Sequence, residues 1–393
     1  MLSSLLRSLV TPLASIRLTV ALLVLSLLMV FAATLDQVQL GVWGVQEKYF
    51  HSFVVYTTIP GTVIAVPVFP GGYLLGGVLL ANLLAAHFTR FRLKWKNCGI
   101  WLTHIGLILL LIGEGVSGLW QRDSHLRIDL DQTKNYAESF RDNELAVIDV
   151  SAPDFDDVVA IPLERVRERS EIRHPRLPFA LRATTYFPNA TIRVRNPLFG
   201  APENSATLGD GTDVSVQPVP VTTNPKESNW PTAFIEIKAG AEAVGTVLVS
   251  TLLVSPQTFS HNGRRWQITL RAKRTYFPFS LTLLKFTHEV YPGTQIPKDF
   301  ASTVRLQSGD GHVDRQVRIF MNSPLRYDGF AIYQSGYENN DRTSILQVVS
   351  NPSWTLPYIA CALMTLGLAI QFLIHLLGYV RRRQLPVGEP RPV

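Results

Sequence analysis

Charged residues and cysteines are both scarce in this sequence. Only 17% of the 393 residues are charged, below the roughly 25% usual for soluble domains. The two cysteines, Cys98 and Cys361, lie in or beside apolar segments and, with the topology derived below, towards opposite faces of the membrane. No disulfide framework is therefore implied, and the sequence has no Cys-x-x-Cys-His motif for covalent haem attachment. Walker-type and dinucleotide-binding glycine motifs, Cys/His zinc spacings and an evident internal repeat are also missing. Nucleotide-binding enzymes and zinc proteins are therefore poor matches.

The charge balance is basic, with a formal net charge of +7 and 47% hydrophobic residues. A positive balance can indicate a nucleic-acid partner. Here the basic residues flank apolar segments, so the lipid bilayer explains them better, and no nucleic-acid partner is expected.

Four apolar segments are long enough to cross a membrane, which takes roughly 20 mostly apolar residues. We expect membrane helices at about 18–35, 71–88 and 98–119, and a fourth within 351–380, whose apolar centre is 357–377. The first segment resembles a signal peptide, but its apolar core is too long and 31–35 is a weak cleavage site. We therefore expect it to be retained. Prolines 60, 67 and 70 argue against a helix between the first two spans, so 36–68 is predicted to be a loop.

Residues 121–350 are predicted to form a large all-β or mainly-β domain. Several stretches alternate in polarity or are β-branched and aromatic, with Asn, Asp, Gly and Pro between them. The segment 196–229, rich in Pro, Asn, Thr and Gly, is a long loop or a division between two lobes. The fold class is therefore a polytopic α-helical membrane protein with three helices in 1–120, a β-rich domain, a fourth helix and a basic tail at 381–393.

Basic residues also predict the topology. Arg7 and Arg17, the cluster at 90–96, and Arg381–Arg383 fall on one side of the membrane if there are four spans. The positive-inside rule makes that side cytoplasmic. Both termini are then cytoplasmic and the β-rich domain is extracytoplasmic (periplasmic in a bacterium). A bacterial cytoplasmic membrane is expected, with a thylakoid membrane as the alternative.

His104 is the one ionisable side chain within the apolar stretch 97–113. Ionisable residues inside a membrane are costly and tend to be functional. One hypothesis is that His104 is an axial ligand to a haem iron, which takes one or two imidazoles in an apolar pocket. The alternative is that His104 bonds a neighbouring helix or lies near the headgroups. His375, at comparable depth in the fourth span, is a candidate second ligand, and a partner histidine is another. His87, beside Arg90 and Arg92, is expected to be interfacial rather than a deep ligand, but it is a third candidate for the second ligand.

The remaining histidines, His51, His125, His174, His261, His288 and His312, are scattered outside the spans in no ligand spacing. They are expected to be surface or structural residues. No nucleophile, base and orienting residue can be recognised as a catalytic set, so no catalytic residue is predicted.

Three motifs resemble the ResB (CcsB) family of cytochrome c biogenesis membrane proteins. They are Met321-Asn-x-Pro-Leu-Arg-Tyr-x-Gly-Phe with Tyr333-Gln334, Gln347-Val-Val-x-Asn-Pro352 before the last span, and His104-x-Gly-Leu with Gly113. The layout of three spans, a large outer domain and one span is also similar. Much of the first motif has the composition of turns and core.

The resemblance implies a subunit of the system II cytochrome c synthase. Such a subunit acts with a CcsA (ResC)-type partner, binds haem b in the membrane, and presents it outside for attachment to apocytochrome c. It implies a non-catalytic or co-catalytic subunit of a haem lyase complex, with His104 as the iron-ligating residue. The alternative is a membrane scaffold or chaperone for apocytochrome and partner that does not bind haem.

Overall fold

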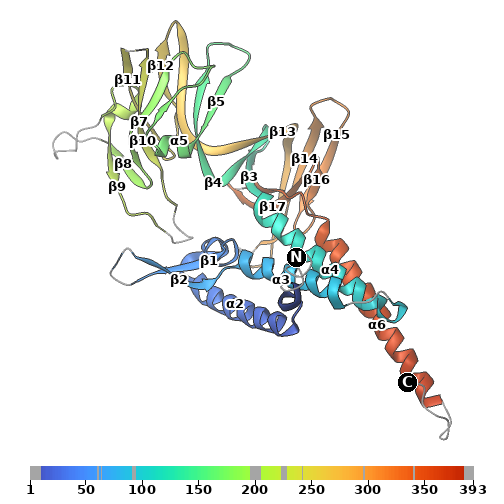
Figure 1. The fold of residues 1–393 in the computed structure, drawn as a ribbon. Coiled ribbons are helices and arrows are strands. Elements are labelled where there is room, and N and C mark those ends of the chain that lie inside the picture. Colours follow the sequence, from blue (N-terminus) through green and yellow to red (C-terminus); the bar gives the residue numbers. More distant parts are fainter. Residues whose placement is uncertain are drawn as a thin grey trace. The chain divides into compact units, whose positions relative to one another are not determined.

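The computed structural model describes residues 10–59, 62, 64–90, 94–194, 205–222, 228–240, 242–294, 297–339 and 341–384. It divides into two compact units. The first, called here the helical unit, consists mainly of the segments Met1–Arg122 and Asn351–Val393. The second, called the β-domain, consists mainly of the residues between them. Figure 1 shows the helices and strands of both units.

The described residues contain four helices that are long and apolar enough to cross a membrane, at Ile16–Phe50, Gly72–Thr89, Trp95–Trp120 and Leu356–Arg381. They correspond to α2 (Ile16–Val45) with the π-turn η1 (Gln46–Phe50), α3 (Gly72–Arg90), the 3-10 turn η2 (Trp95–Asn97) with α4 (Cys98–Trp120), and α6 (Leu356–Gln384). The prediction of three such helices before the β-rich region and one after it is confirmed. The predicted basic tail begins inside α6, and 385–393 lie outside the described residues.

The prediction of a loop over 36–68 is wrong for its first part. Helix α2 continues through Asp36 to Val45 and bends at Gly41, where φ is 68°. Beyond the bend, Lys48 donates to the Asp36 carboxylate at 2.6 Å and the Tyr49 hydroxyl donates to it at 2.8 Å. An acid and a base that look like loop residues in the sequence therefore pair across the bend, which reduces the cost of having them beside apolar surface.

The proline-rich part of the same segment forms a hairpin rather than a helix, as its prolines require. Strand β1 (Val54–Thr58) pairs antiparallel with β2 (Ala65–Pro70), and the register shifts between Val55 and Tyr56. A two-stranded sheet has only edge strands, which tolerate the missing N–H groups of Pro67 and Pro70.

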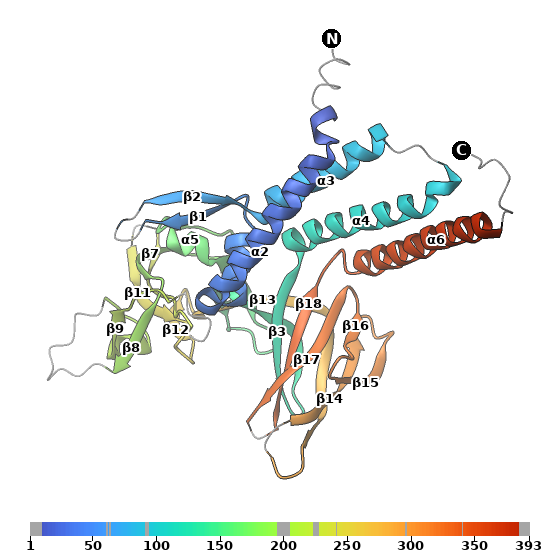
Figure 2. The same cartoon turned by 90° about the horizontal axis from the view of Figure 1, so that it is seen from below.

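A buried amide joins α3 to the start of α2. Asn82 is buried, donates to the Ser15 carbonyl at 3.1 Å and to the Leu13 carbonyl, and accepts from the Thr19 hydroxyl at 2.6 Å. The Leu13 and Ser15 carbonyls lie where the chain enters α2, so the amide bonds backbone acceptors near the helix start. Figure 2 shows α2 running beside α3.

Helices α4 and α6 pack closely in antiparallel orientation, as Figure 2 shows. Gly99, Gly106 and Gly113 are buried along one side of α4. A Cβ at Gly99 would lie 2.5 Å from the Gly367 carbonyl oxygen, and one at Gly106 would lie 2.7 Å from that of Ala360. The seven-residue spacing places these glycines on one face, which lets the two backbones approach as small residues commonly allow in membranes.

Hydrogen bonds fix the end of α4 to the start of α6. Ser353 is 2% exposed; its hydroxyl donates to the Gly113 carbonyl at 3.0 Å and lies 2.8 Å from the Ser117 hydroxyl. The Asn351 amide donates to Ser117 Oγ at 2.9 Å and to Gln121 Oε1 at 3.0 Å. The Asn-Pro-Ser turn that precedes the last span thus acts as a clamp between the two helices.

The β-domain is mainly β, as predicted. Among its described residues, the largest sheet has the order β15-β14-β13-β4-β3-β18-β17-β16, with β12 added to β13 and β5 to β4. A second sheet has the order β11-β10-β7-β6, and β8 pairs with β9. The elements are β3 (Arg122–Asp129), β4 (Thr133–Asp149), β5 (Asp157–Pro162), α5 (Leu163–Arg167), β6 (Glu171–Ile172), β7 (Ala180–Phe187), β8 (Ala190–Val194), η4 (Asp210–Asp213), β9 (Val214–Pro218), β10 (Thr232–Ala239), β11 (Glu242–Ser250), β12 (Gln257–His261), β13 (Arg264–Val290), β14 (Pro297–Ser308), β15 (Asp314–Phe320), β16 (Leu325–Tyr327), β17 (Phe330–Glu338) and β18 (Thr343–Ser350).

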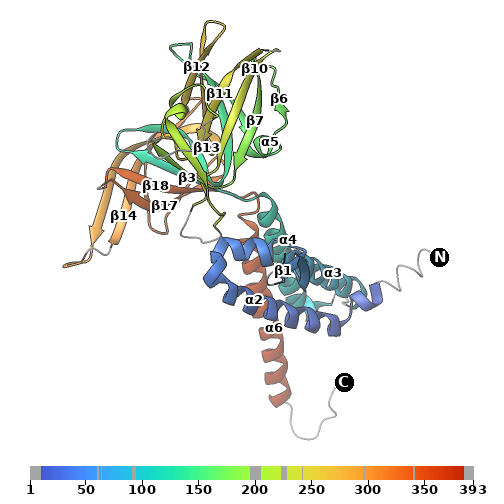
Figure 3. The ribbon, with the colours of Figure 1, turned by 90° about the vertical axis from the view of Figure 1, so that its left-hand side faces the viewer.

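Two hydrophobic cores divide the β-domain into lobes, and the long strands β4 and β13 belong to both. Leu145 of β4 and Ile268 of β13 lie in the first core, which also takes residues of β5, α5, β7, β10 and β11. Ala137 of β4 and Leu281 of β13 lie in the second core, with residues of β3 and β14 to β18. Register shifts at Ala272/Arg274 and Tyr276/Leu281 mark where the paired strands change core. Figure 1 shows both strands passing between the lobes, and Figure 3 shows the first lobe's strands β7, β10 and β11.

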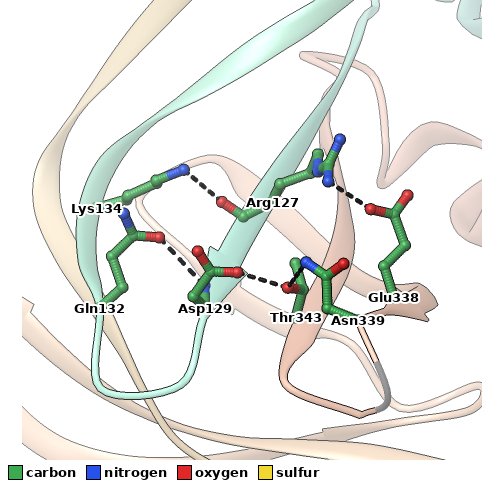
Figure 4. Close-up of polar contacts among 7 residues, drawn as sticks. All are labelled: Arg127, Asp129, Gln132, Lys134, Glu338, Asn339 and Thr343. Carbon is green, nitrogen blue, oxygen red and sulfur yellow. Dashed lines mark hydrogen bonds and ion pairs between the residues drawn. The ribbon is translucent and has the colours of Figure 1, made fainter.

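Side chains at the end of the second lobe tie the β3–β4 turn to the β17–β18 turn (Figure 4). Thr343 donates to the Asp129 carboxylate at 2.5 Å and accepts from Asn339 at 2.9 Å. Arg127 pairs with Glu338 across the same end. These turns therefore close the second lobe through polar contacts.

The proposed division of the β-domain near 196–229 falls partly outside the described residues. Within 205–222 the structure shows η4 and β9, and β9 pairs with β8.

Candidate functional site

The orientation of α4 follows from its glycine face. Gly106 faces α6, and His104 lies two residues away, which corresponds to about 200° around a helix of 3.6 residues per turn. His104 is therefore directed away from α6. The same reasoning applies to Trp101, two residues beyond Gly99. Trp101 and His104 are three residues apart and thus share the other face of α4.

That face meets His87 near the end of α3. The His87 and His104 ring centroids are 4.8 Å apart with an interplanar angle of 83°. The His87 and Trp101 centroids are 4.9 Å apart at 81°. His87 is 6% exposed. Two imidazoles from consecutive membrane helices therefore form an edge-to-face cluster with an indole.

The geometry fixes which His87 nitrogen carries the proton. Nδ1 lies 3.0 Å from the carbonyl oxygen of Leu83, one turn earlier in α3. A carbonyl can only accept, so Nδ1–H is the donor and Nε2 of neutral His87 keeps its lone pair. Histidines that bind metals usually have this arrangement, with the distal N–H held by a carbonyl or carboxylate.

The spacing of the two rings limits how they can meet a metal. Metal–nitrogen bonds are roughly 2 Å long, so an iron held between two imidazoles needs ring centroids about 6 Å apart or more. The observed 4.8 Å leaves no room for that. In this conformation the pair can present one imidazole at a time to an iron.

The predicted site residue His104 thus has a histidine neighbour, which is His87 and not His375. His87 is predicted to be interfacial, and the structure buries it against His104; its depth in a membrane stays a prediction. His375 lies on α6, where its Nε2 is 2.9 Å from the Gln371 amide nitrogen. The face of α4 that carries His104 is turned away from α6, the helix of His375. Sequence alone offered one signal for the pairing: a short link joins two antiparallel spans, which brings residues on either side of the link to similar depth.

The Met321–Phe330 motif of the β-domain, with Tyr333-Gln334, is largely architectural. Leu325 is buried in the second core, and Tyr327 and Phe330 pack against it. Gln334 accepts from the Ser302 hydroxyl at 2.6 Å and donates to the Ser344 hydroxyl at 3.2 Å. These residues hold β14, β17 and β18 together.

Among the histidines predicted to be structural, His288 has a partner on each ring nitrogen. Its Nδ1 lies 3.2 Å from the Asp341 carboxylate, and the Tyr337 hydroxyl lies 3.0 Å from its Nε2. This places His288 as a link between β13 and the β17–β18 hairpin. Within the described residues, no group of three or more His, Cys, Asp or Glu side chains is arranged to hold a metal ion.

Comparison with known proteins identifies a family for this chain. Residues 91–345 match the model of the ResB-like family, a range that includes His104, α4 and nearly all of the β-domain. The chain is also 35% identical over 91 residues to Protein NrfI of Wolinella succinogenes, a match that covers 23% of this chain and 10% of NrfI. The matched segment is thus about a tenth of that relative's length. Because the family match extends over more than half of the sequence, the chain is a member of the ResB-like family.

Proposed function

We propose that this protein is the membrane subunit of a system II cytochrome c synthase that binds haem through His104. Membership of the ResB-like family supports a role in cytochrome c biogenesis. In this proposal the chain acts with a CcsA-type partner to carry haem b across the membrane and present it for attachment to apocytochrome c. It is a non-catalytic or co-catalytic subunit, and haem is its cargo.

The observation that carries the proposal is the position of His104. It is the seventh residue of α4, within a helix long and apolar enough to span a membrane, on the face turned away from the α6 contact. That is the face that meets His87 of α3, so the two imidazoles lie together there. An imidazole in an apolar site matches the preference of haem iron.

Charge near this end of the helices suits the same cargo. The α3–α4 connection carries Arg90, Arg92, Lys94 and Lys96 in sequence. Haem has two carboxylates, and cationic side chains form strong, charge-assisted hydrogen bonds with carboxylates. We propose that this connection is cytoplasmic, as the positive-inside rule indicates, and that the β-domain lies on the opposite side.

The test is a haem spectrum. The full chain is co-expressed with a CcsA-type partner and purified in detergent, and haem content and absorption are compared for wild type and His104→Ala. We expect bound haem in wild type, a marked loss in His104→Ala, and recovery with added imidazole. Equal haem in both proteins would refute His104 as a ligand and would favour the alternative function, a scaffold for apocytochrome and partner.

A further inference from the structure

We infer that His87 is a second iron-ligating residue for haem, taking the iron in exchange with His104. This inference rests on the proposed function, since it concerns the same cargo. It adds a residue that lies outside the matched family range, on a different helix from His104, and it assigns that residue a role in movement of the cargo.

The first support is the hydrogen bond that fixes the tautomer of the His87 ring. Its Nδ1–H is held by the Leu83 carbonyl at 3.0 Å, so the Nε2 lone pair is the ring's remaining acceptor. The hydrogen bond comes from within α3 itself, four residues back, and so persists whatever α4 does. A histidine held in this way needs no change of tautomer to bind iron.

The second support is location. His87 is buried against His104 and Trp101, so an iron that reaches one imidazole is close to the other. An ionisable side chain within a membrane span commonly marks a pathway for the transported species. Trp101 adds an aromatic surface on α4 next to both imidazoles, and a flat apolar porphyrin would pack favourably on such a surface.

The third support is the ring spacing. Because 4.8 Å between centroids excludes an iron between the rings, the two histidines are alternative ligands and not a simultaneous axial pair. In the exchange, one iron–nitrogen bond breaks as the other forms. The His87 Nδ1 proton stays on its bond to Leu83, the iron keeps its oxidation state, and no further reactant is required.

The experiment separates ligation from packing by the choice of variant. His87→Asn keeps an N–H that can reach the Leu83 carbonyl but removes the imidazole Nε2. It is made alone and together with His104→Ala in the full chain, co-expressed with a CcsA-type partner and purified in detergent. His375→Ala is the matched control, because it removes a histidine on α6, the helix from which His104 is turned away. Size-exclusion profiles confirm that each variant is folded.

We expect His104→Ala to retain a fraction of the wild-type haem content and the double variant to lose that fraction. The decrease should exceed the about 10–100-fold loss of metal affinity that removal of an outer-shell partner typically causes. His375→Ala should match wild type. As a direct probe of ligation, His87→Cys in the His104→Ala background should shift the haem absorption bands to those of a thiolate-ligated iron.

Two results would overturn the inference while leaving the proposed function intact. One is a His104→Ala protein with no haem at all, since His87 would then hold none. The other is a double variant with the same haem content and spectrum as His104→Ala, together with an unshifted spectrum for the cysteine variant. A wild-type complex that carries no haem would overturn the proposed function itself.

Discussion

The close contact between α4 and α6 leads to a quantitative prediction for Gly106→Ala. The added Cβ would lie 2.7 Å from the Ala360 carbonyl oxygen and 2.7 Å from Met364 Cγ. Optimal contacts between nonbonded heavy atoms are near 3.5–4.0 Å, so the atoms must separate by roughly 0.8 Å or more. Met364 can change its side-chain conformation, but the Ala360 carbonyl can retreat only if α6 moves.

The matched control is Gly115→Ala on the same helix, where an added Cβ has no neighbour within 4 Å. Both substitutions gain the same helix propensity, about 1 kcal/mol. Their difference therefore isolates the steric cost at the helix contact. Overpacking of this kind typically costs about 1–3 kcal/mol, and we expect Gly106→Ala to be less stable than Gly115→Ala by that amount.

The assay is unfolding of the full chain in mixed micelles with increasing dodecyl sulfate, followed by the helical circular dichroism signal. Gly106→Ala should unfold at a lower dodecyl sulfate fraction than Gly115→Ala. The effects of independent sites usually add to within about 0.3–0.5 kcal/mol. If the two variants are equally stable within that range, the packing argument is refuted and α6 is free to shift.

Three further predictions concern buried polar groups. Ser353→Ala removes the clamp's buried hydroxyl and leaves the Gly113 carbonyl without it, so it should destabilise the full chain by about 1–3 kcal/mol in the same micelle assay; Ser353→Thr, which keeps the hydroxyl, should cost less. Glu144→Leu should cost about 3–5 kcal/mol, because it leaves Arg271, whose side chain is only 13% exposed and whose Nε bonds buried Glu144 at 3.0 Å, without its carboxylate, and chemical denaturation should show partial recovery in Glu144→Leu/Arg271→Met. Burial lowers the pKa of His125 below the unfolded value of about 6.5. The unfolded chain then binds more protons just below that pH, so stability should fall as the pH drops through 6.5, and His125→Gln should flatten the thermal unfolding profile between about pH 7 and 5. An unchanged pH profile would show that His125 does not contribute.

Sequence reasoning located the membrane helices because their signal is local. A charge-free run of about 20 residues predicts a span without knowledge of any partner. The extension of α2 beyond Asp36 could not be predicted in this way. Asp36 is paired with Lys48, twelve residues later and beyond a bend at Gly41. This tertiary contact lowers the free-energy cost of placing the Asp36 carboxylate beside the apolar span.

The candidate site was predicted in part. His104 stands out because it is an ionisable residue in an apolar run, a property visible at a single position. His87 does not, because three residues later the sequence becomes basic and suggests an interface. Its burial depends on how closely α3 and α4 pack, and on the face of α4 that α6 leaves open. Neither can be deduced from hydropathy.

The β-rich character of residues 121–350 was predictable from alternation, but the two cores were not. Alternation indicates which residues share a face only while the register is regular. The shifts near Ala272 and Tyr276 in β13 exchange the two faces of the strand. Because the exchange lies inside one continuous strand, no turn in the sequence marks its position.

The sharing of β4 and β13 between the two cores makes the β-domain one cooperative module. Excision of either lobe would cut both strands, so neither lobe can be removed without interrupting strands that the other lobe uses. Disorder that begins in one core would also reach the other along two covalent strands. The domain should therefore resist limited proteolysis as a whole, and mutations far apart in the sequence, such as those at Leu145 and Leu281, should weaken a single unfolding transition.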